Sequence, residues 1–467
     1  MKIFSTILFF LGCYLSSMAQ SYYMPHESEP HEGTWLQWPH QYEYGMAYRN
    51  ELDTTWIEMT KALVSSENVH IIAYNNAEKN RILSLLAAAN IVLSQIDFYK
   101  FPTNDVWVRD NGPIFVKDSS GQINIEDWGF NGWGGKFNFS KCNIIPKSIG
   151  NAMGINVEDL NAVMVNEGGA VEMDGKGVLM ACKSAIISQS PANSIRNLGM
   201  TQSQAEAIFA QYLGVSKFIW LDGNVGDPND VTDFHIDGFA KFVNTDTLVT
   251  MTPNDLAYWG VSSLDISILN NASNANYQKY TKVYLPLTKN NVITTNGKNL
   301  GYKGSYVNYY IANQVILVPN YHDPNDALAN GIIQSLYPGK TVMGIDCRNL
   351  YQYGGMVHCV TQQQPASDIS ADIEHKEIKK NRVGQNFPNP IEQTSNIPLE
   401  LVKEANIDFI IYNNLGINVF QRNYPQLSAG SHLLTIDATG LENGIYSYII
   451  KIDKENYRGK KLIILKK

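Results

Sequence analysis

The segment Gly-Gly-Met-Val-His-Cys-Val-Thr-Gln-Gln-Gln-Pro at 354–365 contains the cysteine on which the interpretation of this chain depends. The glycine pair before it favours tight or left-handed backbone, so we predict that Cys359 presents its thiol on a loop. A lone cysteine is more often a small buried apolar residue than a nucleophile. Other reactive side chains must therefore accompany Cys359 before it can be interpreted as catalytic.

Two upstream segments supply such side chains: Trp-Val-Arg-Asp at 107–110 and Phe-His-Ile-Asp-Gly at 234–238. His235 and Asp237 are two residues apart, and in a strand this spacing places both side chains on one face. Asp110 precedes Asn-Gly-Pro, which predicts a strand end entering a turn, where functional residues are common. Each feature alone is more often structural. Together with Cys359 they provide a thiol, an imidazole and two carboxylates, a set that suits attack on the carbon of a cationic guanidinium group.

Residues 22–365 alternate apolar runs typical of strands with longer stretches typical of helices. The expected strands include 69–73, 178–180, 247–251 and 315–319, and the expected helices include 53–66, 77–88, 201–213 and 323–336. Such recurring units predict an α/β fold with a repeated architecture, although no internal sequence repeat is visible.

The composition changes after this body. Residues 366–384 are polar and charged without an apolar stripe, which predicts a linker. From 385 to 467 the chain has short alternating runs, such as Ile-Asp-Phe-Ile-Ile-Tyr at 407–412, separated by turn signals. This pattern is typical of a small β-sandwich.

The N-terminus reads as a secretory signal peptide over residues 1–19, with Lys2, a mostly apolar run to Leu15 and small residues ending at Ala19. A membrane anchor is the alternative, but the run of about a dozen apolar residues is shorter than the roughly 20 that cross a bilayer. A lipoprotein cleavage site at Cys13 is a further alternative. No later stretch is apolar enough to cross a membrane, so we expect no span after signal removal.

The net charge of −8 is unevenly placed: residues 1–379 hold 25 Lys+Arg against 36 Asp+Glu, and residues 380–467 hold 11 against 8. An acidic body argues against a nucleic-acid partner and favours a cationic ligand, although simple solubility also explains it. The cysteines outside the signal are widely spaced and form no CxxC pair, so neither a disulfide-rich scaffold nor a zinc knuckle is expected. These cysteines are Cys142, Cys182, Cys347 and Cys359.

Six segments resemble, in order and in flanking residues, the agmatine deiminase and bacterial peptidylarginine deiminase family of guanidine-modifying enzymes. They lie at 24–39, 105–113, 128–135, 166–170, 230–239 and 358–365, and together they cover essentially the whole body at 22–365. The resemblance implies a five-bladed α/β propeller, the pentein fold, with the active site near the central axis.

The resemblance also implies roles for the matching residues. Cys359 matches the nucleophile, His235 the general acid and base, and Asp110 and Asp237 the carboxylates that grip the guanidinium nitrogens. Further residues of the substrate site are matched by Glu167, Trp107 and Asp233. The implied reaction passes through a covalent thiouronium on Cys359 and requires neither a metal nor an organic cofactor.

Two substrates stay open: agmatine, or an arginine-containing peptide. Residues 20–365 contain few arginines and no obvious clamp for a substrate carboxylate, which favours agmatine or another small guanidine. Secretion favours the peptide. Phe234 stands where agmatine deiminases usually have Gly, and Gly238 where they usually have Asn, so the reaction type is better defined than the substrate.

Two other classes of protein are less consistent with the sequence. A non-catalytic binding protein that keeps the fold is disfavoured because all four central residues are present. A papain-like cysteine protease normally places its cysteine before its histidine, whereas Cys359 follows His235.

The tail resembles the C-terminal sorting domain of the type IX secretion system of Bacteroidetes. The similarity lies at 385–390, 415–416, 441–446 and 460–467. It implies export by the type IX machinery across the outer membrane of a Gram-negative bacterium, with removal of the tail and release or surface attachment. An ordinary spacer β-domain is the alternative.

Overall fold

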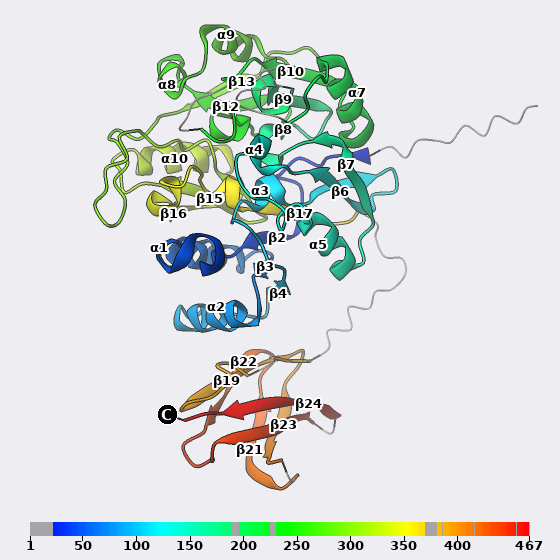
Figure 1. The fold of residues 1–467 in the computed structure, drawn as a ribbon, viewed down its shortest axis with the longest axis vertical. Helices are drawn as coiled ribbons and strands as arrows, with labels where there is room; N and C mark the ends of the chain where they lie inside the picture. The colour runs from blue at the N-terminus through cyan, green and yellow to red at the C-terminus, as the bar shows by residue number, and fades with distance from the viewer. Residues whose placement is uncertain are drawn as a thin grey trace, which may run out of the picture.

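The computed structural model describes residues 22–187, 196–224, 230–368, 381–384, 386–414, 416–453 and 455–466. The predicted signal peptide and most of the predicted linker lie outside these residues. Within them, the body at 22–368 consists of small mixed sheets with helices on its outside, and the strands of the tail lie apart from it, on the side of α2 (Figure 1).

The described residues of the body form five sheets. In spatial order, two of them are β1 (Tyr22–Tyr23), β5 (Ile114–Asp118), β6 (Ile123–Gly129), β7 (Val157–Val165), and β17 (Gln362–Pro365), β2 (His31–Gln37), β3 (Asn68–Ala73), β4 (Ile96–Lys100). The other three are β8 (Val171–Met173), β9 (Val178–Cys182), β10 (Lys217–Leu221); β11 (Ala240–Phe242), β12 (Thr247–Met251), β13 (Thr281–Leu285); and β14 (Tyr310–Ile311), β15 (Val315–Asn320), β16 (Thr341–Asp346).

One strand pattern recurs in all five sheets. A first strand pairs antiparallel with a second, and the second pairs parallel with a third, as in β8–β9–β10 and β11–β12–β13. The same pattern holds for β14–β15–β16, β5–β6–β7 and β17–β2–β3. The architecture is therefore repeated in structure, as the sequence predicted, without a visible sequence repeat.

The longer helices of the body are α1 (Gln41–Leu63), α2 (Asn76–Ala88), α5 (Ile145–Met153), α7 (Gln202–Leu213), α8 (Pro253–Trp259), α9 (Ser263–Asn271) and α10 (Asp326–Leu336). Four of them confirm the expected helices. A capping box between Thr201 and Gln204 begins α7, and Gly214 ends it at φ +71°. The helix α1 starts earlier than expected because the side chain of His40 caps it, and Gly45 at φ +83° then interrupts it.

The tail is a sandwich of two antiparallel sheets. One contains β18 (Arg382–Val383), β19 (Thr394–Leu401) and β22 (Gly430–Asp437), and the other contains β21 (Asn418–Leu427), β20 (Ala405–Tyr412), β23 (Gly444–Ile452) and β24 (Glu455–Ile464). Buried side chains from both sheets, including Ile397, Phe409 and Leu434, form its core. This agrees with the alternating pattern of apolar residues.

The two ends of the predicted linker are folded. At its start, the Lys117 Nζ atom lies 2.7 Å from the Asp368 carboxylate, and the Asp368 N–H donates to the Gly121 carbonyl at 3.0 Å. At its end, β18 pairs with β19. None of the helices in the described part of the chain combines the length and apolar character that a bilayer crossing demands.

Candidate active site

Short helical turns precede the first strand of four of the five sheets. They are α3 (Val108–Asn111) before β5, η1 (Gly168–Ala170) before β8, η2 (Ile236–Gly238) before β11 and η3 (His358–Val360) before β17. Asp110 lies in α3, Glu167 directly precedes η1, His235 and Asp237 belong to the η2 region, and Cys359 lies in η3. Because these turns contact one another, residues far apart in sequence meet at one place.

The local structure around four of these residues differs from the expectation. His235 and Asp237 are not on a strand, because Asp233 and Phe234 adopt left-handed φ values of +58° and +80° and the chain then enters a 3-10 turn. Asp110 is not at a strand end but inside one helical turn. Cys359 likewise lies in a 3-10 turn rather than on an irregular loop. The side chains converge nevertheless, through the turns and not through strand alternation.

The side chains of His235, Asp110 and Asp237 converge on the backbone of Gly169. A Cβ atom at this position would lie 2.7 Å from His235 Nδ1, 2.8 Å from Asp110 Oδ1 and 3.0 Å from Asp237 Oδ2. Only a glycine allows three polar side chains to approach this close to one backbone position. Its own N–H donates to Asp110 Oδ1 at 3.3 Å.

Asp110 is a buried carboxylate with few donors. The Trp133 indole N–H donates to its Oδ2 at 2.9 Å, and His235 Nδ1 lies 3.6 Å from its Oδ1. Burial raises the pKa of Asp110 to about 6; the nearby His235 opposes the rise, and Glu167 and Asp237 add to it. Above that pH, Asp110 offers a negative charge that a cationic ligand would satisfy.

His235 is held from behind by a second carboxylate. Its Nε2 lies 2.7 Å from Glu167 Oε2, and Glu167 in turn accepts from Arg196 Nε at 2.7 Å. Burial alone would lower the pKa of His235, but Asp110 and Glu167 outweigh it and raise the pKa to about 9. At neutral pH the residue is therefore an imidazolium, able to act as an acid.

Cys359 lies beside Asp237 and an asparagine. Its Sγ is 3.9 Å from Asp237 Oδ2, and 3.6 Å and 3.5 Å from the Oδ1 and Nδ2 of Asn308. Burial raises the pKa of the Cys359 thiol well above its ordinary value, and the negative charges of Asp237 and Asp110 raise it further. The unliganded site therefore holds a protonated thiol, which a positive charge placed between the two carboxylates would activate.

A cavity of about 210 Å³ opens onto Cys359 and Asp110. Its walls are mainly aromatic: Tyr44, Tyr48, Trp107, Trp133, Phe137 and Tyr353. At the mouth, Tyr44, Phe137 and Tyr353 are 47%, 42% and 38% exposed. Among the described residues that line this cavity, Asp110 is the only ionised group at neutral pH and there is no Lys or Arg. Trp107 lies where the sequence predicted, with Gly355 against its ring.

Glu167 and Asp233, like His235 and Asp237, are not among the residues that line this cavity, and their predicted role in substrate binding stays a prediction. Both are buried and joined by Arg196, whose Nε and Nη1 lie 2.7 Å and 2.6 Å from Glu167 Oε1 and Asp233 Oδ2. Lys136 Nζ also lies 2.7 Å from Asp233 Oδ2. The ion pairs of Glu167 and Asp233 with Arg196 thus hold the loop that carries His235 in place.

Sequence reasoning missed Asn308, Trp133, Arg196 and His358 as members of the site. Trp133 and His358 lie inside segments that carried the resemblance. Trp133 is flanked by glycines and His358 precedes Cys359, and these neighbours could have indicated that both belong to the site. Asn308 had no motif around it. Asn308 lies just before β14 (Tyr310–Ile311), at the position that the turns α3, η1, η2 and η3 occupy in the other four sheets. Only this equivalence of position in the fold could have identified it.

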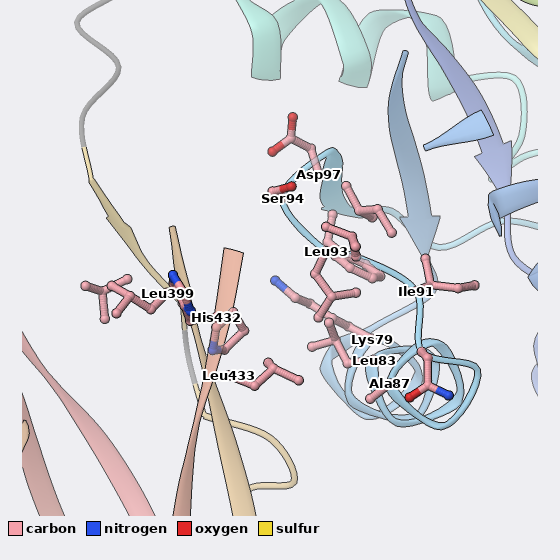
Figure 2. A pocket seen from close by; sticks show the side chains of 17 residues that line it. Lys79, Leu83, Ala87, Ile91, Leu93, Ser94, Asp97, Leu399, His432 and Leu433 are labelled. Carbon is pink, nitrogen blue, oxygen red and sulfur yellow. The ribbon is translucent and has the colours of Figure 1, made fainter. Parts of the chain in front are cut away.

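A larger cavity, of about 730 Å³, lies between α2 and the tail strands β19 and β22 (Figure 2). Leu83, Ala87 and Ile91 lie on one side of it and Leu399 and Leu433 on the other. It contains no thiol and no pair of carboxylates among its lining residues. Volume alone therefore does not identify the reactive site, and we assign it to the cavity at Cys359.

Comparison with known proteins identifies the family. The family model described as Porphyromonas-type peptidyl-arginine deiminase matches residues 23–365. The chain belongs to this deiminase family. A curated relative described as an agmatine deiminase, from Latilactobacillus sakei subsp. sakei, is 30% identical to this deiminase over 372 residues, which cover 75% of this chain and 98% of the relative. Another described in the same way, from Legionella pneumophila strain Paris, is 30% identical, with 74% and 96% covered.

Solved structures show the same fold. A Porphyromonas gingivalis protein described as an arginine deiminase is 30% identical, with a TM-score of 0.64, and the match covers 74% of this chain and 98% of that chain. The agmatine deiminase of Enterococcus faecalis, at 24% identity and a TM-score of 0.63, covers 74% and 96%. This deiminase therefore has the α/β fold of the penteins. It is a hydrolase that acts on the C–N bonds of amidines and removes nitrogen from a guanidinium group.

The tail has its own family. The model described as a secretion system C-terminal sorting domain matches residues 385–465. The deiminase therefore carries the signal by which the type IX secretion machinery of Bacteroidetes exports proteins to the cell surface or beyond.

Proposed function

We propose that this deiminase hydrolyses agmatine, or a similar small guanidine with a basic or neutral far end, to the ureido product (N-carbamoylputrescine from agmatine) and ammonia. The observation that carries the proposal is the cavity wall, which is aromatic and contains no Lys or Arg among its described residues. Arginine and C-terminal peptidylarginine add a carboxylate to the substrate, and burying a carboxylate without a cationic partner is costly.

The proposed roles follow from the charges of the site. Asp110 and Asp237 hold the planar guanidinium by charge-assisted hydrogen bonds, with its carbon beside Cys359 Sγ. The bound cation offsets the two carboxylates that keep the thiol protonated, so the substrate itself assists formation of the thiolate. Asn308, within 3.6 Å of Sγ, orients the sulfur. Glu167 holds His235.

The proposed reaction has two stages. The Cys359 thiol loses its proton to solvent, and Sγ forms a bond to the guanidinium carbon. His235 donates a proton to a terminal nitrogen, and the C–N bond breaks to release ammonia, which leaves a thiouronium on Cys359 and a neutral His235. Water then adds to the thiouronium carbon and gives one proton to the neutral His235. The C–S bond breaks as the second proton of the water passes to the sulfur, which releases the ureido product. The thiol and the imidazolium are restored.

Peptidylarginine is the second candidate substrate. Two observations favour it: the matching family model is described as a peptidyl-arginine deiminase, and the exposed rings of Tyr44, Phe137 and Tyr353 surround an open mouth. An arginine side chain within a peptide, which has no free carboxylate at the arginine, would reach Cys359 through this mouth.

Release of ammonia and ureido product from agmatine, free arginine, a peptide with internal arginine and a peptide ending in arginine tests the proposal. We expect agmatine to give the highest kcat/KM, and Cys359→Ala to abolish turnover while retaining agmatine binding by calorimetry. Preference for either peptide would replace agmatine with peptidylarginine. Absence of turnover on all four substrates would contradict both candidates.

We also propose that the five sheets close into a five-bladed propeller, supported by the recurrent strand pattern and by the pairing of β17, the last strand of the body, with β2 near its start. Residues 1–19 would be removed as a signal peptide, and the exported enzyme would act outside a Gram-negative cell. Mass spectrometry of the mature protein in culture medium and on washed cells would test both cleavage and location.

A further inference from the structure

Glu27, from the Met-Pro-His-Glu-Ser-Glu-Pro-His segment at 24–31, lies beneath the site and has no role in the reaction proposed above. Its Oε2 is 2.7 Å from His358 Nε2, and its Oε1 accepts from the Ile311 N–H at 2.7 Å. Lys241 Nζ and Arg109 Nη2 lie 3.2 Å and 3.4 Å from the same carboxylate. One buried side chain therefore contacts four segments of the body.

These contacts lie directly behind the residues of the proposed reaction. Arg109 precedes Asp110, His358 precedes Cys359, and Lys241 is four residues after Asp237. The imidazole of His358 continues the connection, because its Nδ1 is 2.8 Å from Asp237 Oδ2. Glu27, His358 and Asp237 thus form a continuous chain of hydrogen bonds.

The ring of His358 lies between two carboxylates. Both ring nitrogens face carboxylate oxygens, at 2.7 Å and 2.8 Å, and an ionised carboxylate can only accept hydrogen bonds. In the pair with Asp237, Nδ1 of His358 is therefore the donor. Burial alone would raise the pKa of Glu27, but Lys241 and His358 outweigh it and hold the pKa well below its ordinary value, so Glu27 is ionised.

We propose that Glu27 and His358 are positioning residues for deimination: Glu27 holds the ring of His358 in place, and His358 fixes the orientation of Asp237. The inference rests on the proposed role of Asp237 in gripping the guanidinium. A His358 ring that was free to turn would no longer donate to Asp237 Oδ2, and the carboxylate could then turn away from Cys359.

The charged groups around this chain determine what its removal does. His358, His235 and Arg109 favour the ionised form of Asp237. Asp110 and the Cys359 thiol also lie near Asp237. His358 is faced by Glu27, Asp237 and Lys241, whose Nζ lies 3.3 Å from Nε2. Burial alone would raise the pKa of Asp237, and His358, ahead of His235, is the main group that lowers it.

Glu27→Gln in the full-length protein is the test. Glutamine removes the negative charge that Lys241, Arg109 and His358 contact, so the ring of His358 is held less firmly against Asp237. We expect KM for agmatine to rise roughly tenfold while kcat falls less, because substrate binding is weakened first. The acid limb of kcat/KM should move up by about one pH unit and become steeper, because two carboxylates must then lose protons.

Glu67→Gln is the matched control. Glu67 is another buried carboxylate beside a histidine, 3.4 Å from His31 Nδ1, and it does not contact Asp237 or His358. It should lower the unfolding temperature without changing the pH profile. Glu27→Asp, which keeps the charge, should retain the position of the acid limb. His358→Asn supplies a second test, since the shorter side chain cannot bridge Glu27 and Asp237 as the ring does.

The proposal is overturned if Glu27→Gln or His358→Asn gives the same KM and pH profile as Glu67→Gln in an enzyme that turns over agmatine. A Glu27→Gln protein that does not fold leaves His358→Asn to decide. Inactivity of the wild-type protein on every guanidine would contradict the proposed function instead, and the two failures are thereby distinguished.

Discussion

The indole Nε1 of Trp133 donates a 2.9 Å hydrogen bond to the carboxylate of Asp110. Trp133 itself has φ +54° and lies between Gly132 and Gly134, which are also left-handed. A backbone conformation that costs energy thus places an aromatic ring against a carboxylate of the site, and strain of this kind is common where function requires it.

Trp133→Phe should impair substrate binding through Asp110. Losing a hydrogen bond to a charged group costs roughly 1.5 to 3 kcal/mol, equivalent to about a tenfold to hundredfold fall in kcat/KM. The indole N–H lowers the pKa of Asp110, so its removal should also move the acid limb upward. Steady-state kinetics across pH measures both. An unchanged kcat/KM would mean that this bond does not hold Asp110 for substrate.

The pH dependence of kcat/KM should be bell-shaped. Below about pH 6, Asp110 is protonated and loses the charge that attracts the guanidinium, so activity should rise as pH increases through that value. Above about pH 9, His235 loses the proton that it must donate, so activity should fall. Initial rates at low agmatine concentration give the profile, and Asp110→Asn should remove the acid limb together with most of the activity. A flat profile from 5 to 10 would contradict both assignments.

Gly169→Ala should inactivate the enzyme without unfolding it. The new methyl group would lie within 3.0 Å of His235, Asp110 and Asp237, so at least one of them must move. We expect kcat/KM to fall by about 100-fold or more, since small displacements of reacting groups have effects of this size. Gly331→Ala in α10, where a Cβ meets no atom within 4 Å, is the control and should keep full activity. Circular dichroism and thermal unfolding check the fold of both.

Phe234→Gly tests whether the strained backbone of Phe234 or the packing of its ring contributes more to the free energy of unfolding. Glycine relieves the left-handed φ of +80°, a gain of about 1 kcal/mol. It also removes a buried ring that packs 5.1 Å from Phe239, and such deletions cost roughly 3 to 5 kcal/mol. The free energy of unfolding in urea should therefore fall by about 2 to 4 kcal/mol. A stabilised variant would show that strain dominates at this position.

Phe137→Arg should change the preference between substrates. The ring is 42% exposed at the cavity mouth, where an added guanidinium would pair with a substrate carboxylate and repel an amine. We expect the ratio of kcat/KM for arginine over agmatine to rise about tenfold or more. Phe137→Leu, which adds no charge, should leave the ratio nearly unchanged. If both variants change it equally, ring contact rather than charge selects the substrate.

The sequence predicted which residues would form the candidate site better than it predicted the local secondary structure around them. Asp110, His235, Asp237 and Cys359 lie in contiguous motifs, and residue chemistry together with a family resemblance was sufficient to select them. Their local structure was predicted wrongly because one-turn helices are too short to have a period, and because Phe234 adopts a φ that its residue type disfavours.

Longer elements were easier to predict because their signals repeat along the chain. Helix α7 has a complete capping box and a glycine stop, and β12 occupies the expected residues 247–251. Glu27 and Asn308 could not be predicted as parts of the site, because their partners are brought near only by the arrangement of all five sheets. No local pattern describes such contacts.

The position of β17 at the C-terminal end of the body matters because the ribosome makes this strand after the rest of the body. Gln362–Pro365 pairs with β2 at the start of the body, and the 3-10 turn that holds Cys359 immediately precedes it. The segment that joins the end of the body to its beginning is thus the one that delivers the thiol. A chain that is still emerging from the ribosome lacks both the thiol and the strand that joins the end of the body to its beginning, so activity can arise only after the whole body has been synthesised.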